Sequence, residues 1–216
     1  MKWSEKTWQA VEKIYEEILN LPFIKDLSKG TLSDERFKFY LIQDALYLND
    51  YSRTLMNIAL KLQNPEYGEA FMKFANDGVA VERILHESFL NGHVPSKSEM
   101  TPTCKLYTSY LVSSLYNPHI EVSLAAVLPC FWIYQKVGEH IYNTAETENN
   151  KYQNWINTYA DESFAESTQK AIEICNVMAD NCSEVQKQEM TEAFVLATKM
   201  EWMFWDSAYR LEKWPV

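Results

Sequence analysis

Apolar residues recur every three or four positions along most of the chain, and no segment alternates apolar and polar residues over the length of a strand. A spacing of three and four places apolar side chains on one face of a helix, whereas a half-buried strand needs a spacing of two. Only five glycines and seven prolines interrupt the pattern. The sequence therefore predicts an all-α protein, and its 216 residues suit one helical domain over 1–216.

Prolines and capping residues mark the ends of the expected helices. Six of the seven prolines fall where the apolar spacing breaks. Ser4 and Ser33 stand where N-caps are expected, and Thr101 precedes a proline in the tolerated first position. Ser183 and Gln186 have the spacing of a capping box. With a short linker after the first, the expected helices cover about 4–20, 34–62, 65–90, 102–116, 120–143, 151–158, 161–180 and 183–211.

Two of these helices carry a carboxylate on their apolar face. At 100° per residue, Asp44 falls within the apolar stripe of the second helix and Glu201 within that of the last. An ionised carboxylate that is buried alone is costly, so each acid needs a partner, a raised pKa or a ligand cavity. A buried salt bridge or tyrosine hydroxyls would satisfy one such acid. Two of them, beside an inward cysteine, favour a cavity.

Pro129 and Cys130 stand inside a run that otherwise has the pattern of a buried helix. A proline in a helix interior costs about 3 kcal/mol, and a kink there opens the packing. Cys130 shares its helix face with Tyr134, so its thiol points inward. Tyrosines gather on or near the same inward faces, which suits a flat aromatic ligand, although each alone is equally explained as core filling. They are Tyr47, Tyr51, Tyr107, Tyr110, Tyr134 and Tyr159.

The charge of the chain narrows the class of ligand. A net charge of −10 without a dense basic cluster argues against nucleic acid and anionic membranes, which leaves a small molecule. The segment "MKWSEKTWQAVEK" lacks the apolar core of a secretory signal, so we expect a cytoplasmic protein. The run "LAAVLPCFWIY" is shorter than the roughly 20 residues that cross a bilayer. The four cysteines lack a C-x-x-C spacing and are expected to be free thiols.

A metal site is not expected. Glu82 and His86 are spaced i, i+4 and resemble half of a di-iron carboxylate site, but no E-x-x-H motif completes it. We interpret the pair as a structural contact. The alternative is that the pair lies next to Asp44 and supports it from outside the site. No cofactor is predicted.

Five separated segments resemble the TenA family, thiaminase II, in that family's order. They are "FKFYLIQDALYL", "LYTSYL", "AAVLPCFWIYQKVGE", "YQNWINTYADESF" and "EWMFWDSAYR". The resemblance implies a haem-oxygenase-like helical bundle, assembled as a homotetramer. It also implies an aminopyrimidine aminohydrolase that salvages thiamin breakdown products.

The same resemblance implies a role for each site residue. Asp44 would anchor an aminopyrimidine, Cys130 would be the nucleophile and Glu201 the acid and base. The presence of the cysteine suggests the cysteine-containing branch of the family. Tyr51 and Tyr110 are treated as adjacent to the pocket only. The side chains expected to line it are Tyr47, Tyr107, Tyr134, Tyr159 and Phe204.

Three other functions were weighed against this one. A non-catalytic protein that binds thiamin-like ligands would keep the same pocket without turnover. A haem-binding relative, or one of the pyrroloquinoline type, shares the implied fold. The haem version needs a histidine on an early helix, and the first histidine is His86. A purely structural bundle does not explain the inward acids.

Overall fold

The computed structural model describes residues 1–89, 93–145 and 150–216, with the backbone alone over 78–89. Within these residues the chain forms helices and no strand, as the apolar spacing predicts. The elements are α1 (Trp3–Asn20), α2 (Pro22–Ser28), α3 (Asp34–Lys61), α4 (Pro65–Phe89), a 3-10 helix η1 (Lys97–Glu99), α5 (Pro102–Ser114), α6 (Ile120–Thr144), α7 (Gln153–Tyr159), α8 (Glu162–Asp180) and α9 (Glu184–Arg210).

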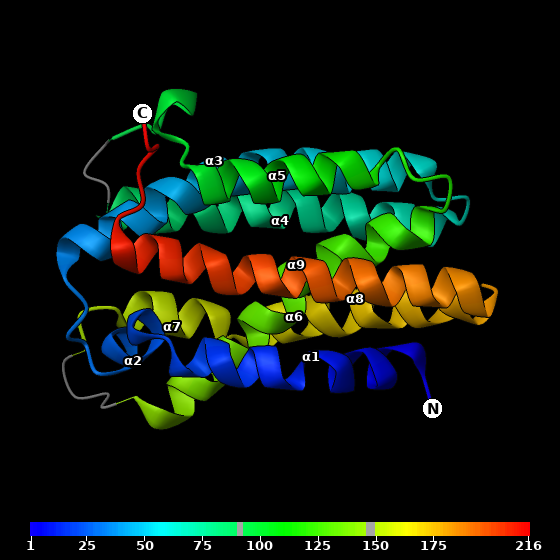
Figure 1. Cartoon of the computed structure of the whole chain (residues 1–216), viewed down its shortest axis with the longest axis horizontal. Helices are drawn as coiled ribbons and strands as arrows, with labels where there is room; N and C mark the ends of the chain where they lie inside the picture. The colour runs from blue at the N-terminus through cyan, green and yellow to red at the C-terminus, as the bar shows by residue number, and fades with distance from the viewer. Residues whose placement is uncertain (90–92, 146–149) are drawn as a thin grey trace.

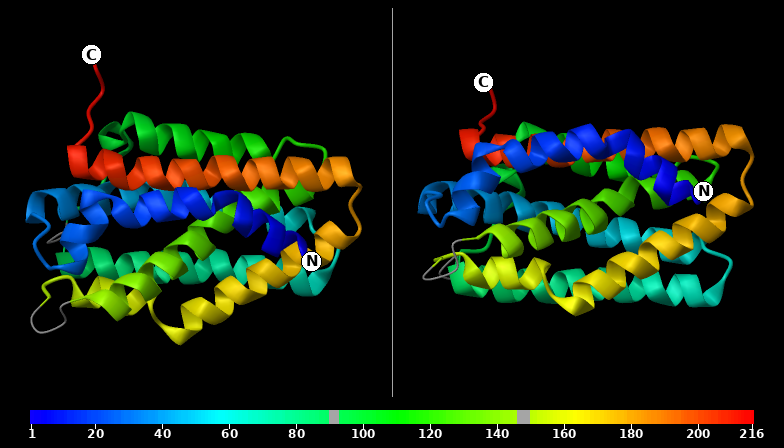
Figure 2. Two further views of the ribbon diagram at one scale, coloured as in Figure 1. Left: turned by 60° about the horizontal axis from the view of Figure 1, so that its bottom comes forward. Right: turned by 90° about the horizontal axis from the view of Figure 1, so that it is seen from below.

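The longer helices run along the long axis of an elongated bundle (Figure 1). α3, α4 and α5 lie on one side of α9, and α1, α7 and α8 lie on the other (Figure 1). α6 crosses the bundle obliquely, as two further views show (Figure 2), and packs against α7, α8 and α9. α3, α6 and α9 also contact one another. The three helices that carry Asp44, Cys130 and Glu201 therefore meet in the interior.

Two predicted N-caps are confirmed. The Ser33 hydroxyl accepts a hydrogen bond from the backbone N–H of Arg36 at the start of α3. Ser183 and Gln186 form a capping box at the start of α9. Both caps satisfy backbone N–H groups that a helix start leaves without partners. They fix where the two acid-bearing helices begin.

Of the other two predicted N-caps, Ser4 is wrong, and Thr101 is correct in position but does not cap through its side chain. α1 begins one residue before Ser4, which is buried in the first turn and whose backbone N–H donates to Asn176 Oδ1 at 3.0 Å. Thr101 holds the N-cap position of α5, but its side chain makes no capping bond. The Glu212 carboxylate serves instead, accepting from the N–H and the hydroxyl of Thr103, both at 2.9 Å. A residue beyond the end of α9 therefore caps α5.

A linker was predicted where the structure has α2. In α2, which has seven residues, the side chains of Phe23, Ile24 and Leu27 are buried, and Pro22 takes the first helical position. Seven residues are too few for a 3.6-residue period to stand out, so only the proline signalled this helix. Gly30 follows with a positive φ of 69°, a conformation that glycine adopts without strain.

α6 is the central helix of the bundle and runs unbroken through Pro129. Among the described residues, this helix alone is long and apolar enough to span a membrane by length and composition. However, 67% of its apolar window is buried inside the bundle. Its apolar character therefore matches its place in the core.

Gly138 lets α6 and α7 touch backbone to backbone. A Cβ atom at this position would lie 2.5 Å from the carbonyl oxygen of Tyr159 and 2.7 Å from its carbonyl carbon. Only glycine permits so close an approach. This contact fixes the end of α7, and with it the aromatic ring of Tyr159.

We expect Gly138→Ala to lower the free energy of unfolding by about 1–2 kcal/mol. Overpacking against a rigid backbone costs more than the roughly 1 kcal/mol that alanine gains over glycine in a helix. Urea denaturation measures the change. Gly68→Ala is the control, because its Cβ would meet only the Ala59 carbonyl oxygen at 3.2 Å. An equal loss in both variants would contradict the special role of the α6 and α7 contact.

Candidate active site

Both inward acids are buried as predicted. Asp44 on α3 is 2% exposed and Glu201 on α9 is 1% exposed. Cys130 on α6 is partly exposed, and it lines a cavity of about 710 Å³ together with Asp44. A volume of this size is typical of sites for small molecules.

The cavity has aromatic walls. Tyr134 on α6 and Tyr159 on α7 line it, with their ring centroids 5.2 Å apart. Burial raises the pKa of both hydroxyls most, and charge on Tyr40 and then on Asp44 raises it further. Asp44 lines the same cavity as the two rings. Together these groups offer a planar heterocycle two aromatic faces and one carboxylate edge.

Four of the eight predicted site residues line the cavity, and four do not. Asp44, Cys130, Tyr134 and Tyr159 are lining residues. The other four pack against one another beside the cavity wall; they are Tyr47, Tyr107, Glu201 and Phe204. Tyr51, a lining residue, stacks on Tyr47 with ring centroids 5.4 Å apart. The ring of Tyr47 in turn contacts those of Tyr107 and Phe204, and Tyr107 reaches Glu201.

Tyr107 is the partner of the buried Glu201. Its hydroxyl donates to Glu201 Oε1 at 2.7 Å. Burial raises the pKa of Glu201 to about 8, and the hydrogen bond from Tyr107 opposes that rise. At pH 7 the protonated acid therefore predominates, with about a tenth of the carboxyl ionised.

Cys130 rests as a neutral thiol. Burial raises the pKa of this thiol well above its usual value, and charge on Glu201 raises it further. The nearby hydroxyls of Tyr47 and Tyr51 oppose the rise. Because the thiolate is the nucleophilic form, Cys130 needs a group that accepts its proton.

The mouth of the cavity is polar and is formed by α4, α7 and α8. Lys73 and Asp77 on α4 form an ion pair at 2.6 Å. Asp161 caps α8, because its carboxylate accepts from the backbone N–H of Ser163 at 2.9 Å. The cavity is therefore polar where it opens to solvent and mostly aromatic in its interior.

The described residues contain no group of three or more His, Cys, Asp or Glu side chains that could hold a metal ion. The interpretation of Glu82 and His86 falls outside the described side chains. Acids, phenols and a thiol are among the reactive groups that the described part of the cavity offers, with the amine of Lys73 at its mouth.

Some lining residues were not predicted from the sequence. Leu48 and Phe131 are aliphatic and aromatic wall residues, and Phe74 comes from α4, where the sequence singled out only Glu82 and His86. Tyr51 was predicted only to be adjacent, yet it lines the cavity. The signal for Leu48 and Tyr51 was present, since both belong to the apolar stripe that contains Asp44.

A model of the TENA/THI-4/PQQC family matches residues 8–211. The chain is 31% identical to a protein of Bacillus subtilis (strain 168) named aminopyrimidine aminohydrolase, over 99% of this chain and 92% of that protein.

Solved structures confirm the fold. The TenA homologue protein from P. horikoshii OT3 has a TM-score of 0.84 and 25% identity, over 97% of this chain and 99% of that chain. A domain of unknown function from Shewanella denitrificans OS217, described as having a heme oxygenase-like fold, has a TM-score of 0.71 and 12% identity, over 96% and 92% of the two chains. The prediction of an all-α bundle of the haem-oxygenase-like class is therefore correct.

We expect Glu201→Gln to remove a pH dependence of stability. Below pH 4.5, the ordinary pKa of this residue type, Glu201 is protonated in both the folded and the unfolded chain. Between pH 4.5 and about 8 only the folded chain holds the proton tightly. Raising the pH through this window therefore destabilises the wild type relative to Glu201→Gln, by up to about 5 kcal/mol at 1.4 kcal/mol per pKa unit.

Urea unfolding at a series of pH values measures this difference. Glu166→Gln serves as the control, because it neutralises an exposed carboxyl and should keep the pH dependence of the wild type. Parallel curves for the wild type and Glu201→Gln would show that the folded-state pKa of Glu201 is not raised.

Proposed function

The chain belongs to the TENA/THI-4/PQQC family, and from this membership and its cavity we propose that it is an aminopyrimidine aminohydrolase, a hydrolase of C–N bonds. The proposed reaction converts 4-amino-5-aminomethyl-2-methylpyrimidine and water into the 5-hydroxymethyl pyrimidine and ammonia, for thiamin salvage. Thiamin itself is a weaker substrate. One observation carries the proposal: a buried acid and a thiol share one aromatic cavity in a chain 31% identical to an enzyme of that name.

Asp44 is suited to recognise the pyrimidine. A 4-aminopyrimidine presents an exocyclic N–H beside a ring nitrogen, and a carboxylate can accept from both when that nitrogen is protonated. The two oxygens of Asp44 match this pair of donors. Tyr134 and Tyr159 stand beside the acid in the same cavity and supply aromatic surface for the ring. Binding through one edge leaves the opposite part of the ring and its substituent toward Cys130.

Cys130 is suited to act as the nucleophile. Addition of its thiolate to an electron-poor ring carbon places an electron pair in the ring. The ring can then expel the amine from the exocyclic carbon, a departure that the aromatic ring alone does not favour. Water next adds to that carbon, and the C–S bond breaks as the electron pair returns to sulfur. This splitting of a hard step into easier ones is the benefit of covalent catalysis.

Glu201 is suited to move the protons of each step. As a carboxylate it accepts the proton of the Cys130 thiol, and as an acid it gives that proton to the departing amine. It then takes a proton from the attacking water and returns it to the sulfur when the thiol is released. A pKa of about 8 keeps both forms populated near neutral pH, which this exchange requires. The charge on Glu201 already acts on Cys130.

The finer predictions rest on the same resemblance. Tyr47, Tyr107 and Phe204 support the reacting groups from beside the cavity wall. The cysteine-containing branch, the homotetramer, the cytoplasmic location and the absence of a cofactor stay predictions. Exposed apolar side chains on α5 and α9, namely Leu106, Val112 and Leu196, give a homotetramer apolar surface to cover.

We expect Cys130→Ser to abolish release of the hydroxymethyl pyrimidine while the protein stays folded and binds the substrate. Serine keeps the size of the side chain but is a far weaker nucleophile at neutral pH. Mass spectrometry of products from the aminomethyl pyrimidine and from thiamin measures the loss, and calorimetry measures binding. Cys182→Ser is the matched control, because this thiol lies outside the cavity. An active Cys130→Ser would remove the nucleophile from the proposal, and a wild type that binds tightly without turnover would indicate a binding protein.

We expect Asp44→Ala and Glu201→Gln to fail in different ways. Loss of Asp44 removes the paired hydrogen bonds to the ring, so the substrate dissociation constant should rise most in that variant. Glu201→Gln cannot exchange protons, so kcat should fall by about 10²- to 10⁴-fold with a smaller change in binding. Single-turnover kinetics and calorimetry separate the two effects. Small and equal effects in both variants would contradict this division of roles.

A further inference from the structure

Tyr51 joins α3 to the turn of α6 that carries the thiol. The residue is 4% exposed and lines the cavity beside Cys130. Its hydroxyl donates to the backbone carbonyl of Val127 at 2.9 Å. Val127 precedes Cys130 by three residues on α6, so the two lie on the same turn. One side chain of α3 therefore binds the backbone turn that carries the thiol and lines the same cavity as the thiol.

The ring of Tyr51 is held in place by other rings. It stacks on Tyr47 with centroids 5.4 Å apart and planes 20° apart. It also meets the ring of Phe131, at a centroid distance of 5.9 Å. Because the ring is fixed, the part of Tyr51 that remains free to move is the hydroxyl hydrogen, by rotation about the C–O bond.

The hydrogen of this hydroxyl has two possible acceptors. A tyrosine hydroxyl carries one donor hydrogen and lone pairs that accept. While the hydrogen points at the Val127 carbonyl, the oxygen can only accept, which suits the S–H of a neutral thiol. A thiolate has no hydrogen and instead needs a donor. Turning the hydrogen to the sulfur exchanges a neutral hydrogen bond for a charge-assisted one, which is about twice as strong.

We propose that Tyr51 is a positioning residue for the nucleophile: its hydroxyl holds the Val127 carbonyl while Cys130 is a thiol, and turns to donate to the Cys130 sulfur when the thiolate forms. No covalent bond changes in this step, and the proton of Cys130 still passes to a separate base. The inference deepens the proposed function and rests on it for the reaction that the thiolate performs.

Other titratable groups around Cys130 set the background for this effect. Charge on Glu201 and Asp44 disfavours the thiolate, whereas the hydroxyls of Tyr47 and Tyr51 favour it. Because Tyr47 remains when Tyr51 is changed, the expected effect is partial. The groups that face the thiol or line its cavity are Asp44, Tyr47 and Tyr51 from α3, Lys73 and Asp77 from α4, Tyr107 from α5, Tyr134 from α6, Tyr159 from α7, Asp161 and Glu166 from α8 and its cap, and Glu201 from α9.

Tyr51→Phe tests the proposal, because it removes the hydroxyl and keeps the ring. Iodoacetamide alkylation of Cys130, resolved by peptide mass spectrometry over a range of pH, reports the thiolate directly. We expect the midpoint of alkylation to move to higher pH, and the rate at neutral pH to fall about three- to tenfold. In the assay with the aminomethyl pyrimidine, kcat should fall by a similar factor, with its pH profile displaced in the same direction and KM nearly unchanged.

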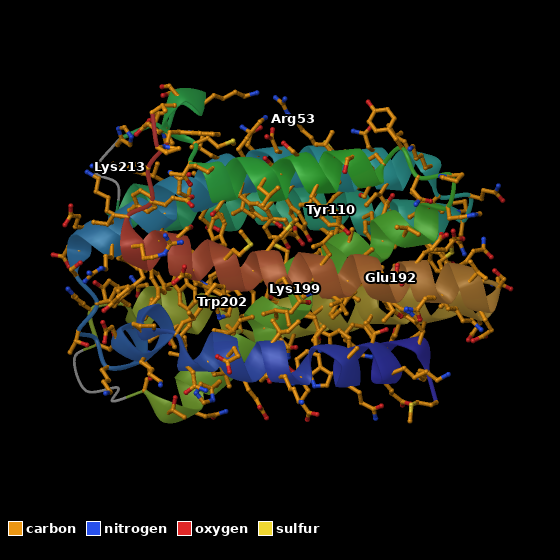
Figure 3. The ribbon with its side chains drawn as sticks, viewed as in Figure 1. Arg53, Tyr110, Glu192, Lys199, Trp202 and Lys213 are labelled. Carbon is orange, nitrogen blue, oxygen red and sulfur yellow. The ribbon has the colours of Figure 1, made fainter. Side chains whose placement is uncertain are left out.

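Tyr110→Phe is the matched control. Tyr110 lies between α5 and α9 (Figure 3), and its hydroxyl also donates to a backbone carbonyl, that of Ala193 at 3.1 Å. It does not line the cavity. The alkylation of Cys130 should therefore be the same in Tyr110→Phe as in the wild type. Cys182, which is partly exposed, gives a reference thiol within every sample.

A second substitution keeps the test independent of folding. A ring-fluorinated tyrosine at position 51 has nearly the same shape but a stronger donor hydroxyl, so the Cys130 midpoint should move to lower pH, opposite to Tyr51→Phe. An unchanged midpoint in both proteins would overturn the proposal, as would a faster reaction in Tyr51→Phe. A wild-type Cys130 that fails to react at any pH would also overturn it.

The outcomes separate this inference from the proposed function. If the wild type releases no product from the pyrimidine but the Cys130 midpoint moves as expected, the function fails and the role of Tyr51 stands. If product forms and the midpoint does not move, only the role of Tyr51 fails.

Discussion

A hydrogen bond from Tyr107 to Glu201 is the interaction on which the rest of the site depends. It joins α5 to α9 and satisfies an acid that is 1% exposed. Burial alone would keep the carboxyl neutral, whereas the tyrosine donor favours its charged form. The balance leaves an acid that can change its protonation near neutral pH. Its charge acts in turn on Cys130, so the state of the thiol follows the state of this bond.

The fold was largely predictable where one helix face dominates the pattern. Asp44 and Glu201 each stood within an apolar stripe, and both are buried. Ser33 and Ser183 signalled helix starts because each cap is a local contact within four residues. α2 was not predicted because about two turns of helix give too little periodicity. The role of Glu212 at the start of α5 depends on residues more than a hundred positions apart, and no local pattern encodes it.

The sequence predicted which residues gather at the site, but not how far each side chain lies from the cavity. A helix face indicates which side chains point inward, while the distance of each from a cavity depends on how neighbouring helices pack. Tyr134 and Tyr159 reach the cavity, whereas Tyr47 lies behind the ring of Tyr51 and Tyr107 lies behind that of Tyr47. Tyr51 was given too small a part because its main partner is the carbonyl of Val127, and a backbone acceptor leaves no mark in a sequence.

The contact between Glu212 and the first turn of α5 ties the last residues of the chain to the reacting centre. Glu212 binds Thr103, and the indole N–H of Trp214 donates to the carbonyl of Met100 at 2.9 Å. The helix anchored in this way carries Tyr107. Substitution or deletion of Glu212 and Trp214 therefore acts on the helix that supplies the donor to Glu201, although both residues lie outside that helix. For expression of this protein, modification at the opposite terminus leaves that anchor undisturbed.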